Sequence, residues 1–510
     1  MIAFARLHTI AEPLERDITT YAVIGHEMLA GRKLYTDLWD HKPPAIHLTY
    51  ATAELVAGYG PQEVYLLNVL VAIVTTLGVW RASLACTESA GGSLLAAALW
   101  AVTSGDLALQ ANQPNTEAFL NACLIWALAI LLGGTGASPG RRRASAAGAL
   151  FALASLYKPV VITVPIALSF VLLARSSRSA NGTRRALAGI AWMAAPGFLA
   201  WTLVFGWFAA ANRFGDAFDA IVIYNRAYAG SLRDNLAVGL TARHAIPGCL
   251  GTVVEMPAMA LLALVWSWLA RRRLSARGTA SPSTPAVGAL LGAYALGVAL
   301  AVALPGRSYC HYYQLWLPLL PVVAAWALVR LRLALPSSGR STARALGVAL
   351  LGVVVLLQVP SYLLSPDQWS MRKYGSLFVA TRRAAAQIDK VLTPGETFYE
   401  WGAETGLYFY TRRDPPTGVF FNYPLLQGPL VRTLSARVIR DLAVARPELV
   451  IVATPDAASF SNPVMQWVAQ RYVAVPPAVL PGIGYPFVLQ GGVLQARLRA
   501  RANSTSGSWY

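Results

Sequence analysis

The sequence predicts a polytopic α-helical membrane protein that carries a small α/β domain at its C-terminal end. Of its 510 residues, 56% are hydrophobic and only 13% are charged, whereas charged residues make up about 25% of an average soluble domain. The charges are also segregated, because long apolar runs alternate with short arginine-rich connectors; this is typical of a chain that crosses a bilayer repeatedly. We therefore assign the net charge of +18 to loops beside a lipid bilayer and expect no nucleic-acid partner.

Ten apolar stretches are long enough to be transmembrane spans. A span needs about 17–25 residues, or fewer where neighbouring protein covers its ends. We expect spans near residues 62–80, 91–105, 116–133, 144–157, 159–174, 187–209, 249–270, 286–304, 313–329 and 345–363. Two of them are short and meet at a hinge, Lys158-Pro159. The apolar stretch 45–57 is too short to cross and is predicted to be a re-entrant or interfacial helix.

The distribution of arginines between alternate connectors predicts the orientation. One set of connectors is rich in arginine, whereas the opposite short connectors hold only Lys158 and Arg307. Cytoplasmic loops carry the excess of Lys and Arg, so the arginine-rich set is predicted to face the cytoplasm. We therefore predict a multi-pass protein of the inner (plasma) membrane with three domains. These are a first extracytoplasmic loop with juxtamembrane helices (1–61), a transmembrane helical domain (62–364) and an extracytoplasmic C-terminal α/β domain (365–510).

The C-terminal region has the pattern of a small α/β domain. Its apolar runs are short and turn residues are frequent. Strands are predicted at 397–401, 406–410, 419–422 and 449–453, with helices near 373–391 and 430–445.

The four cysteines, Cys86, Cys123, Cys249 and Cys310, lie within or beside apolar runs. Their spacing fits neither a zinc site nor a disulfide framework. We predict that they are buried as small apolar side chains, although Cys249 and Cys310 could share one side of the membrane.

Ionisable residues are concentrated on the predicted outer side. Glu117, Lys158 and His311 lie at span ends, and charged groups at membrane depth usually line a functional cavity. In the first loop, His41-Lys42 is followed by a tandem proline and then an apolar helix. Two cations at a helix N-terminus favour an anionic ligand. The sequence therefore predicts a site that binds an anion and transfers a proton.

These residues carry a family resemblance. The segments Arg16–Tyr21, Gly31–Tyr35 and His41–Pro44 resemble the first external loop of GT-C glycosyltransferases, within the protein O-mannosyltransferase and lipid A aminoarabinose transferase branch (glycosyltransferase family 39-like). Weaker matches follow in the same order along the chain, at Pro114–Glu117, Lys158-Pro159 and His311–Gln314 with Pro318 and Pro321.

The resemblance implies inverting transfer of a sugar from a polyprenyl-phosphate-linked donor to an acceptor at the extracytoplasmic face. It implies that Asp17 is the general base or orients the acceptor, and that Lys42 lies near the lipid phosphate. The other candidate phosphate-binding residues are His41, Lys158, His311 and Arg307. The candidate pocket residues are Glu117, Tyr21, Asp40, Tyr312 and Gln314.

The sequence departs from the family pattern in two ways. Ile18 stands where the family commonly has a second acidic residue, so Asp17 acts alone or with Glu15. No metal ligands are assigned, and a divalent cation stays open as a cofactor. The family also has a span before the first loop, so we expect that the first span is missing here.

Two other classes of function stay open. A transporter or flippase of a lipid-linked or anionic substrate also needs many spans and buried charges, although transporters often show repeats that are not evident here. A non-catalytic membrane scaffold is the third class. The sugar is undetermined, and the acceptor could be a glycan, a lipid or a protein.

Overall fold

The computed structural model describes residues 2–134, 138–176, 180–240, 255–276, 284–307, 309–453, 461–476 and 478–504. The chain forms two compact units, each described here by itself. The first, the transmembrane unit, comprises Met1–Ile10, Tyr65–Trp207 and Ala229–Ser365. The second, the loop–tail unit, comprises Ala11–Val64, Phe208–Tyr228 and Pro366–Tyr510.

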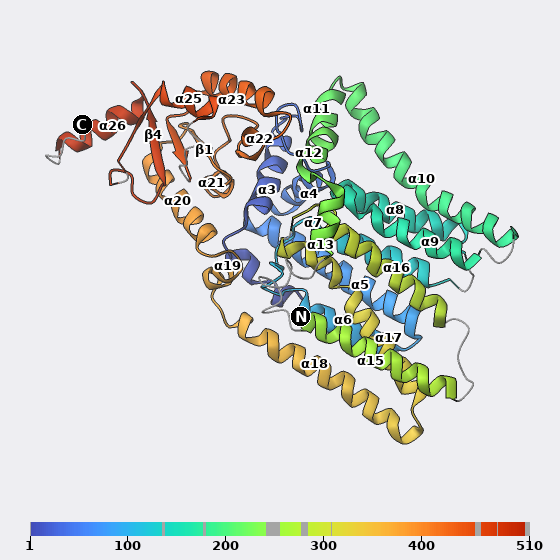
Figure 1. Ribbon diagram of the computed structural model, residues 1–510. Helices are drawn as coiled ribbons and strands as arrows, with labels where there is room; N and C mark the ends of the chain where they lie inside the picture. Colours follow the sequence, from blue (N-terminus) through green and yellow to red (C-terminus); the bar gives the residue numbers. More distant parts are fainter. Residues whose placement is uncertain are drawn as a thin grey trace. The chain divides into compact units, whose positions relative to one another are not determined.

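Helices occupy all ten positions predicted for spans (Figure 1). They are α5 (Pro61–Thr87), α6 (Ala90–Thr103), α7 (Thr116–Leu132), α8 (Arg141–Tyr157), α9 (Thr163–Ser176), α10 (Ala180–Ala210), α15 (Glu255–Ala276), α16 (Thr284–Ala303), α17 (Leu319–Ala334) and α18 (Arg340–Tyr362). Residues 249–254 of one predicted span lie outside the described residues. Six helices in the described part are, by length and composition, able to cross a membrane. The polytopic helical fold is therefore confirmed.

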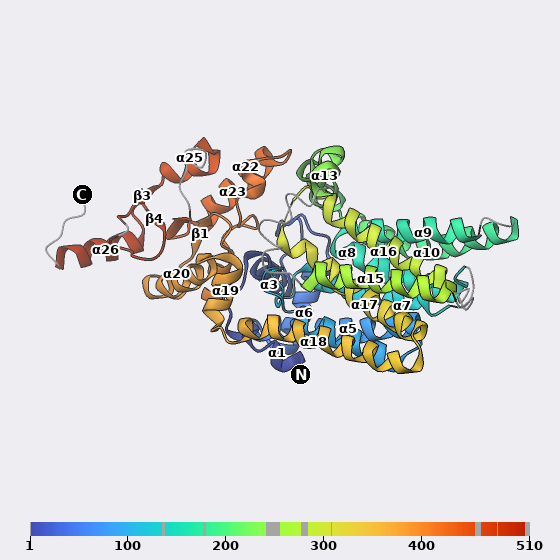
Figure 2. The same ribbon diagram turned by 60° about the horizontal axis from the view of Figure 1, so that its bottom comes forward.

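Close helix packing organises the transmembrane unit. Helix α15 packs on α17, α7 on α8, and α9 on α16, and α8, α9, α10 and α16 lie together in two views (Figures 1 and 2). At the α9–α16 contact, a Cβ on Gly297 would lie 2.5 Å from Val164 Cα. The Thr163 hydroxyl donates to the Gly297 carbonyl at 2.7 Å. Only glycine permits this approach of two backbones.

The hinge between α8 and α9 is a short 3₁₀ turn, η1 (Pro159–Ile162). Lys158 ends α8 in an extended conformation, with φ −156° and ψ 108°. A residue before proline avoids the helical region, and proline suits the first turn of a helix. The sequence Lys158-Pro159 therefore breaks the helix and leaves the lysine at the break.

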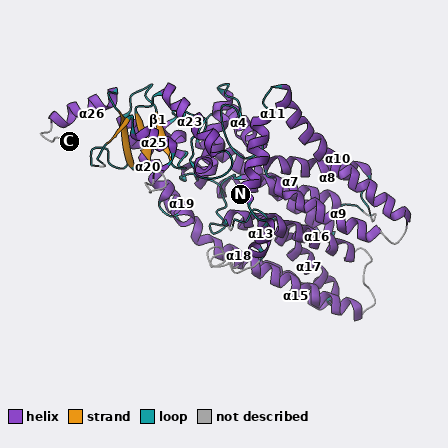
Figure 3. Ribbon diagram, turned by 45° about the horizontal axis from the view of Figure 1, so that its top comes forward, coloured by secondary structure: helices purple, strands orange, loops and turns teal. Residues whose placement is uncertain are grey.

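The loop–tail unit contains a four-stranded sheet (Figure 3). The strands β1 (Phe398–Trp401), β2 (Leu449–Val452), β3 (Tyr472–Ala474) and β4 (Tyr485–Leu489) have the order β1-β2-β4-β3. Strands β1 and β2 are parallel, and the other two pairs are antiparallel. The C-terminal helices are α19 (Pro366–Tyr374), α20 (Leu377–Val391), α21 (Gly406–Thr411), α22 (Tyr423–Leu426), α23 (Val431–Ala445), α25 (Pro463–Ala469) and α26 (Val493–Ser504).

Two predicted strands are wrong. Residues 406–410 form helix α21, and 419–422 form no strand. A short apolar aromatic run fits a buried helix as well as a buried strand, because periodicity does not separate them at this length. Strands β3 and β4 were not predicted. The strands at 398–401 and 449–452 are confirmed.

The prediction for the cysteines is wrong at Cys310, which is disulfide-bonded. Cys86 and Cys123 are free thiols, and Cys249 lies outside the described residues. Cysteine spacing along the chain does not reveal a pairing that depends on the fold.

The burial of Glu400 on β1 predicts a pH dependence of the protein's stability. Its side chain is fully buried, and burial, aided by the charge of Glu404, raises its pKa well above the ordinary value. The unfolded chain releases this proton above about pH 4.5 while the folded protein retains it, so the free energy of unfolding falls as the pH rises past that value. We expect Glu400→Gln to raise the thermal unfolding temperature at pH 8 but hardly at pH 4. Equal shifts at both pH values would contradict a buried, protonated carboxyl group.

Candidate functional site

The candidate base, Asp17, lies in the first turn of α3 (Arg16–Leu29) in the loop–tail unit. Glu15 is the N-cap of this helix, and its carboxylate accepts a hydrogen bond from the Asp17 backbone N–H at 3.4 Å. Burial, and then the negative charge of Asp17, raise the pKa of Glu15 well above its ordinary value. This shift favours the protonated form of Glu15 beside Asp17. Asp17 itself is half-buried.

Helix α3 is anchored on both sides within the loop–tail unit. Arg16 forms an ion pair of 2.9 Å with Glu404, and the Thr19 and Thr20 hydroxyls lie 2.8 and 3.0 Å from that of Thr405. On its other side α3 packs against α4 (Ala45–Ala57), where a Cβ on Gly25 would lie 2.8 Å from the Ala51 nitrogen. These contacts fix the turn that carries Asp17.

A first-loop cluster consists of Tyr21, Asp40, His41 and His47. The buried Asp40 carboxylate lies 3.2 Å from His41 Nδ1 and 3.2 Å from His47 Nε2. Burial alone would raise the pKa of Asp40, but the hydrogen bonds and charges of the two histidines outweigh it and lower the pKa. Tyr21 packs edge-on against His47, with ring centroids 5.8 Å apart. Asp40 thus stays ionised and orients the His41 ring.

Lys42 directly follows His41, three residues before helix α4 begins. The Tyr35 hydroxyl donates to the Lys42 carbonyl at 2.7 Å, which fixes the backbone. The Lys42 side chain is half-buried and forms no ion pair with any residue that the structure describes. Its charge is therefore available to an anionic ligand near the N-terminus of α4.

The transmembrane unit contains a second group, the lysine cluster of Glu117, Lys158 and Tyr312. Lys158 Nζ donates to Glu117 Oε1 at 2.7 Å, and the same nitrogen lies 3.4 Å from the centroid of the Tyr312 ring. The Thr116 hydroxyl donates to the other Glu117 oxygen at 2.9 Å. The Glu117 side chain is only 1% exposed and that of Lys158 13% exposed. The ammonium group is thus held by a carboxylate on one side and an aromatic face on the other.

The remaining predicted residues surround the turn η3 (Cys310–Trp316) in the same unit. Gln314 donates to the Leu109 carbonyl, and its own carbonyl accepts from Asn121, both at 2.9 Å. His311 Nδ1 lies 3.2 Å from Gln110 Oε1. Arg307, which precedes this turn, is half-buried.

Three residues in or around the first-loop cluster were not predicted from the sequence: His47, Tyr224 and Tyr228. His47 lies in helix α4 and was not among the predicted site residues, but it contacts Asp40. Tyr224 and Tyr228 lie with their ring centroids 5.5 and 5.6 Å from that of His41. The i,i+4 spacing of Tyr224 and Tyr228 indicates that the two side chains are neighbours on a helix. Nothing in the sequence around them indicates a contact with the first loop.

Within the ranges that the structure describes, no group of three or more His, Cys, Asp or Glu side chains is placed so that it could hold a metal ion. The ionisable groups instead form the pairs given above. Acid–base and electrostatic chemistry is what these described groups can perform.

Comparisons with known proteins define the class. Residues 41–203 match the family model described as dolichyl-phosphate-mannose-protein mannosyltransferase, a match that begins at His41 and includes Lys158. No curated protein matches the sequence. The helices and this match identify a multi-pass membrane protein, and they confirm the predicted resemblance to GT-C glycosyltransferases.

Two solved structures show the particular fold. The chain is similar to ArnT from Cupriavidus metallidurans bound to undecaprenyl phosphate, with a TM-score of 0.57 and 17% identity over 96% of this chain and 97% of that one. It is also similar to the apo state of that protein, with a TM-score of 0.55 and 17% identity over 92% and 93% of the two chains. The chain therefore has the fold of ArnT along nearly its whole length.

Proposed function

We propose that this chain is a membrane glycosyltransferase that transfers a sugar from a polyprenyl-phosphate-linked donor to an acceptor at the extracytoplasmic face, with inversion. Two observations together support the proposal. The fold is that of a protein whose structure contains undecaprenyl phosphate, and the mannosyltransferase family match begins at the His41-Lys42 motif.

In the proposed reaction an acceptor hydroxyl attacks the anomeric carbon of the donor. The new bond joins the acceptor oxygen to that carbon, and the bond from the carbon to the phosphate oxygen breaks. The acceptor proton passes to the Asp17 carboxylate, and polyprenyl phosphate leaves with the bonding electrons. The transition state resembles an oxocarbenium ion, as in other glycosyl chemistry. General base catalysis of this kind contributes about 10²–10⁴-fold.

The cationic residues have the complementary role. Lys42 offers an ammonium group without an ion-pair partner in the described ranges, and Lys158 is held in place by Glu117. In the proposal these residues, with His41, His311 and Arg307, stabilise the charge that develops on the departing phosphate. The raised pKa of Glu15 limits the negative charge beside Asp17, and Asp17 is the proposed proton acceptor.

The disulfide at Cys310 supports the proposed orientation. Disulfides persist in oxidising compartments and are rare in the cytosol. Cys310 opens η3, the turn that also carries His311 and Tyr312. An oxidised Cys310 thus favours the extracytoplasmic side for this turn, as does the arginine distribution.

Donor-phosphate binding can be tested by thermal unfolding in nanodiscs. We expect undecaprenyl phosphate, but not undecaprenol, to raise the unfolding temperature, since a ligand that binds only the folded state stabilises it. Lys42→Met should remove most of this increase because its ammonium group is lost. Lys390→Met, at an exposed lysine in α20, is the matched control and should leave the increase unchanged. Equal shifts with both lipids, or a full shift in Lys42→Met, would contradict the phosphate-binding role.

A transporter would also bind the donor, so cleavage separates the two classes. The proposal requires that the bond between sugar and phosphate breaks. Movement of intact donor across a vesicle bilayer without cleavage would overturn it.

A further inference from the structure

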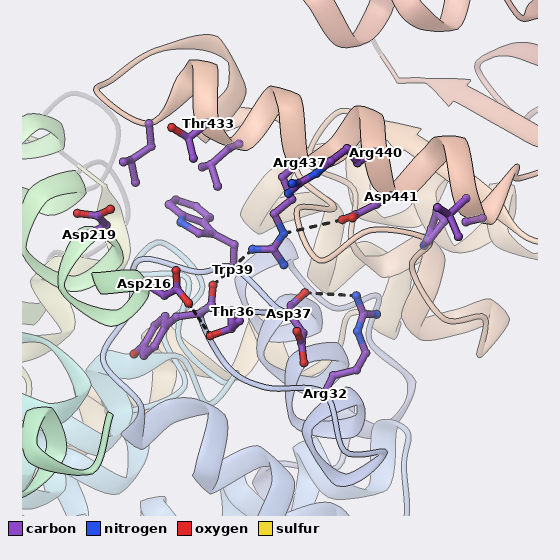
Figure 4. A pocket seen from close by; sticks show the side chains of 16 residues that line it. Arg32, Thr36, Asp37, Trp39, Asp216, Asp219, Thr433, Arg437, Arg440 and Asp441 are labelled. Carbon is purple, nitrogen blue, oxygen red and sulfur yellow. Dashed lines mark hydrogen bonds and ion pairs between the residues drawn. The ribbon is translucent and has the colours of Figure 1, made fainter. Parts of the chain in front are cut away.

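A polar cavity in the loop–tail unit has not been given a role above. It has a volume of about 740 Å³ and is lined by the first-loop turn, by the segment containing α11 (Phe214–Phe218) and the π-helix η2 (Asp219–Tyr224), and by α23 (Figure 4). None of the residues predicted for the catalytic site lines it. Its charged lining residues are Arg32, Arg437, Arg440, Asp37, Asp216, Asp219 and Asp441.

The cavity wall is held in a defined conformation. A Cβ on Gly418 would lie 1.6 Å from the Asp37 carbonyl oxygen, and the Trp39 N–H donates to the Gly418 carbonyl at 2.9 Å. Tyr35, in the same turn, has a positive φ of 69°, which is uncommon for a residue with a side chain. Strained and closely packed turns of this kind cluster at ligand sites, and single π-helical turns are also frequent there.

Some lining groups are engaged and others are available. The Asp216 carboxylate accepts from the Thr36 hydroxyl at 2.7 Å, and Arg437 donates to the Tyr35 carbonyl at 3.4 Å (Figure 4). Arg440 and Asp219 are exposed, and neither forms an ion pair with another residue that the structure describes. The cavity thus offers a donor and an acceptor that are both open to a ligand.

The mixture of charges indicates the chemistry of the ligand. Four carboxylates oppose three guanidinium groups, so the lining has no positive excess that would favour a phosphate. A hydroxyl group both donates and accepts, and it therefore suits a wall that contains both carboxylates and guanidinium groups. Apolar side chains such as Leu430, Leu434 and Val444 provide surfaces for the carbon faces of a sugar ring. The volume lies within the usual range of about 300–1,000 Å³ for ligand pockets.

We infer that this cavity is a binding site for a neutral, hydroxyl-rich carbohydrate, the acceptor glycan of the transfer reaction. Its role as the acceptor site rests on the proposed function, whereas carbohydrate binding does not. Asp219 accepts hydrogen bonds from sugar hydroxyls, Arg440 donates to sugar oxygens, and the wall formed by α23 packs against the ring faces.

Binding of defined trisaccharides to the full chain tests this inference. The protein is placed in nanodiscs, because sugar-headed detergents would compete, and titrated calorimetrically with mannotriose, arabinotriose and chitotriose. We expect at least one of them to bind. Thr433→Trp, at an exposed lining position of α23, should weaken that binding about tenfold or more by filling the cavity. Asp219→Asn should weaken it about tenfold through loss of charge-assisted hydrogen bonds.

Ala436→Trp is the matched control, since residue 436 is exposed on the same helix but does not line the cavity. Unchanged affinity in this variant is the expected result. Glucose 1-phosphate and inorganic phosphate are titrated in the same way. Three results would overturn the inference: no trisaccharide binds, binding is equal in Thr433→Trp and the wild type, or only the two phosphate compounds bind. Carbohydrate binding without sugar transfer would instead retain the cavity as a carbohydrate site and refute the proposed enzyme activity.

Discussion

Asp17→Asn is expected to lower sugar transfer about 10²–10⁴-fold, which is the usual contribution of a general base. The substitution keeps the shape of the side chain and removes the charge that accepts the proton. Helix α3 should remain in place because Glu15 caps it and Arg16 anchors it to Glu404. Initial rates with a radiolabelled polyprenyl-phosphate sugar measure the effect, and the thermal shift caused by undecaprenyl phosphate reports binding separately.

The matched control is Asp389→Asn, which removes a half-exposed carboxylate that lies 3.4 Å from Arg413. It should transfer sugar at the wild-type rate, because exposed pairs of this kind contribute little. Wild-type turnover in Asp17→Asn would show that Asp17 is not the base. A parallel loss of lipid binding and turnover would mean that Asp17 acts in binding and not at the chemical step.

Of the substitutions proposed, Lys158→Met is expected to cause the largest loss of stability. It leaves the Glu117 carboxylate buried without its cation, and breaking a buried ion pair in this way typically costs about 3–5 kcal/mol. The pair is short, at 2.7 Å, and the Thr116 hydroxyl on the other carboxylate oxygen does not replace the lost charge. Thermal unfolding in nanodiscs measures the destabilisation.

The double substitution Lys158→Met with Glu117→Gln separates structure from function. It removes both charges, so most of the stability should return. The rate of sugar transfer should nevertheless remain roughly 10²–10³-fold below that of the wild type if Lys158 supplies one electrostatic contact to the departing phosphate. Recovery of both stability and turnover would contradict that role and leave the pair with a structural one.

The helices were predictable because their signals are local. The short helix expected at 45–57 is α4, which spans the same residues, and every predicted span contains a helix. Apolar length and a proline at a break suffice for such predictions. The strand expected at 406–410 is a helix, because five apolar residues carry too little periodicity to separate the two.

The chemistry of the site was predictable only in part. Residue type and position relative to the membrane were enough to select Glu117 and Lys158, 41 residues apart, which form an ion pair. The same reasoning could not find the contact between Asp40 and His47, since this contact depends on the path of the chain from the first-loop turn into helix α4. It also missed the polar cavity, whose wall combines the first loop with α23; Tyr35 and Arg437, which are in contact there, are 402 residues apart. Contacts between distant segments leave no periodic signal in one sequence.

The most direct test of the account is turnover of a defined donor by the purified protein in nanodiscs. Synthetic polyprenyl-phosphate mannose and polyprenyl-phosphate arabinose, each labelled in the sugar, are incubated with a glycan acceptor and the wild-type chain. We expect the labelled sugar to appear on the acceptor, with inverted configuration at its anomeric carbon. An equal amount of free polyprenyl phosphate should form. Folded protein that binds undecaprenyl phosphate but cleaves neither donor would contradict the glycosyltransferase function and favour a transporter or a scaffold.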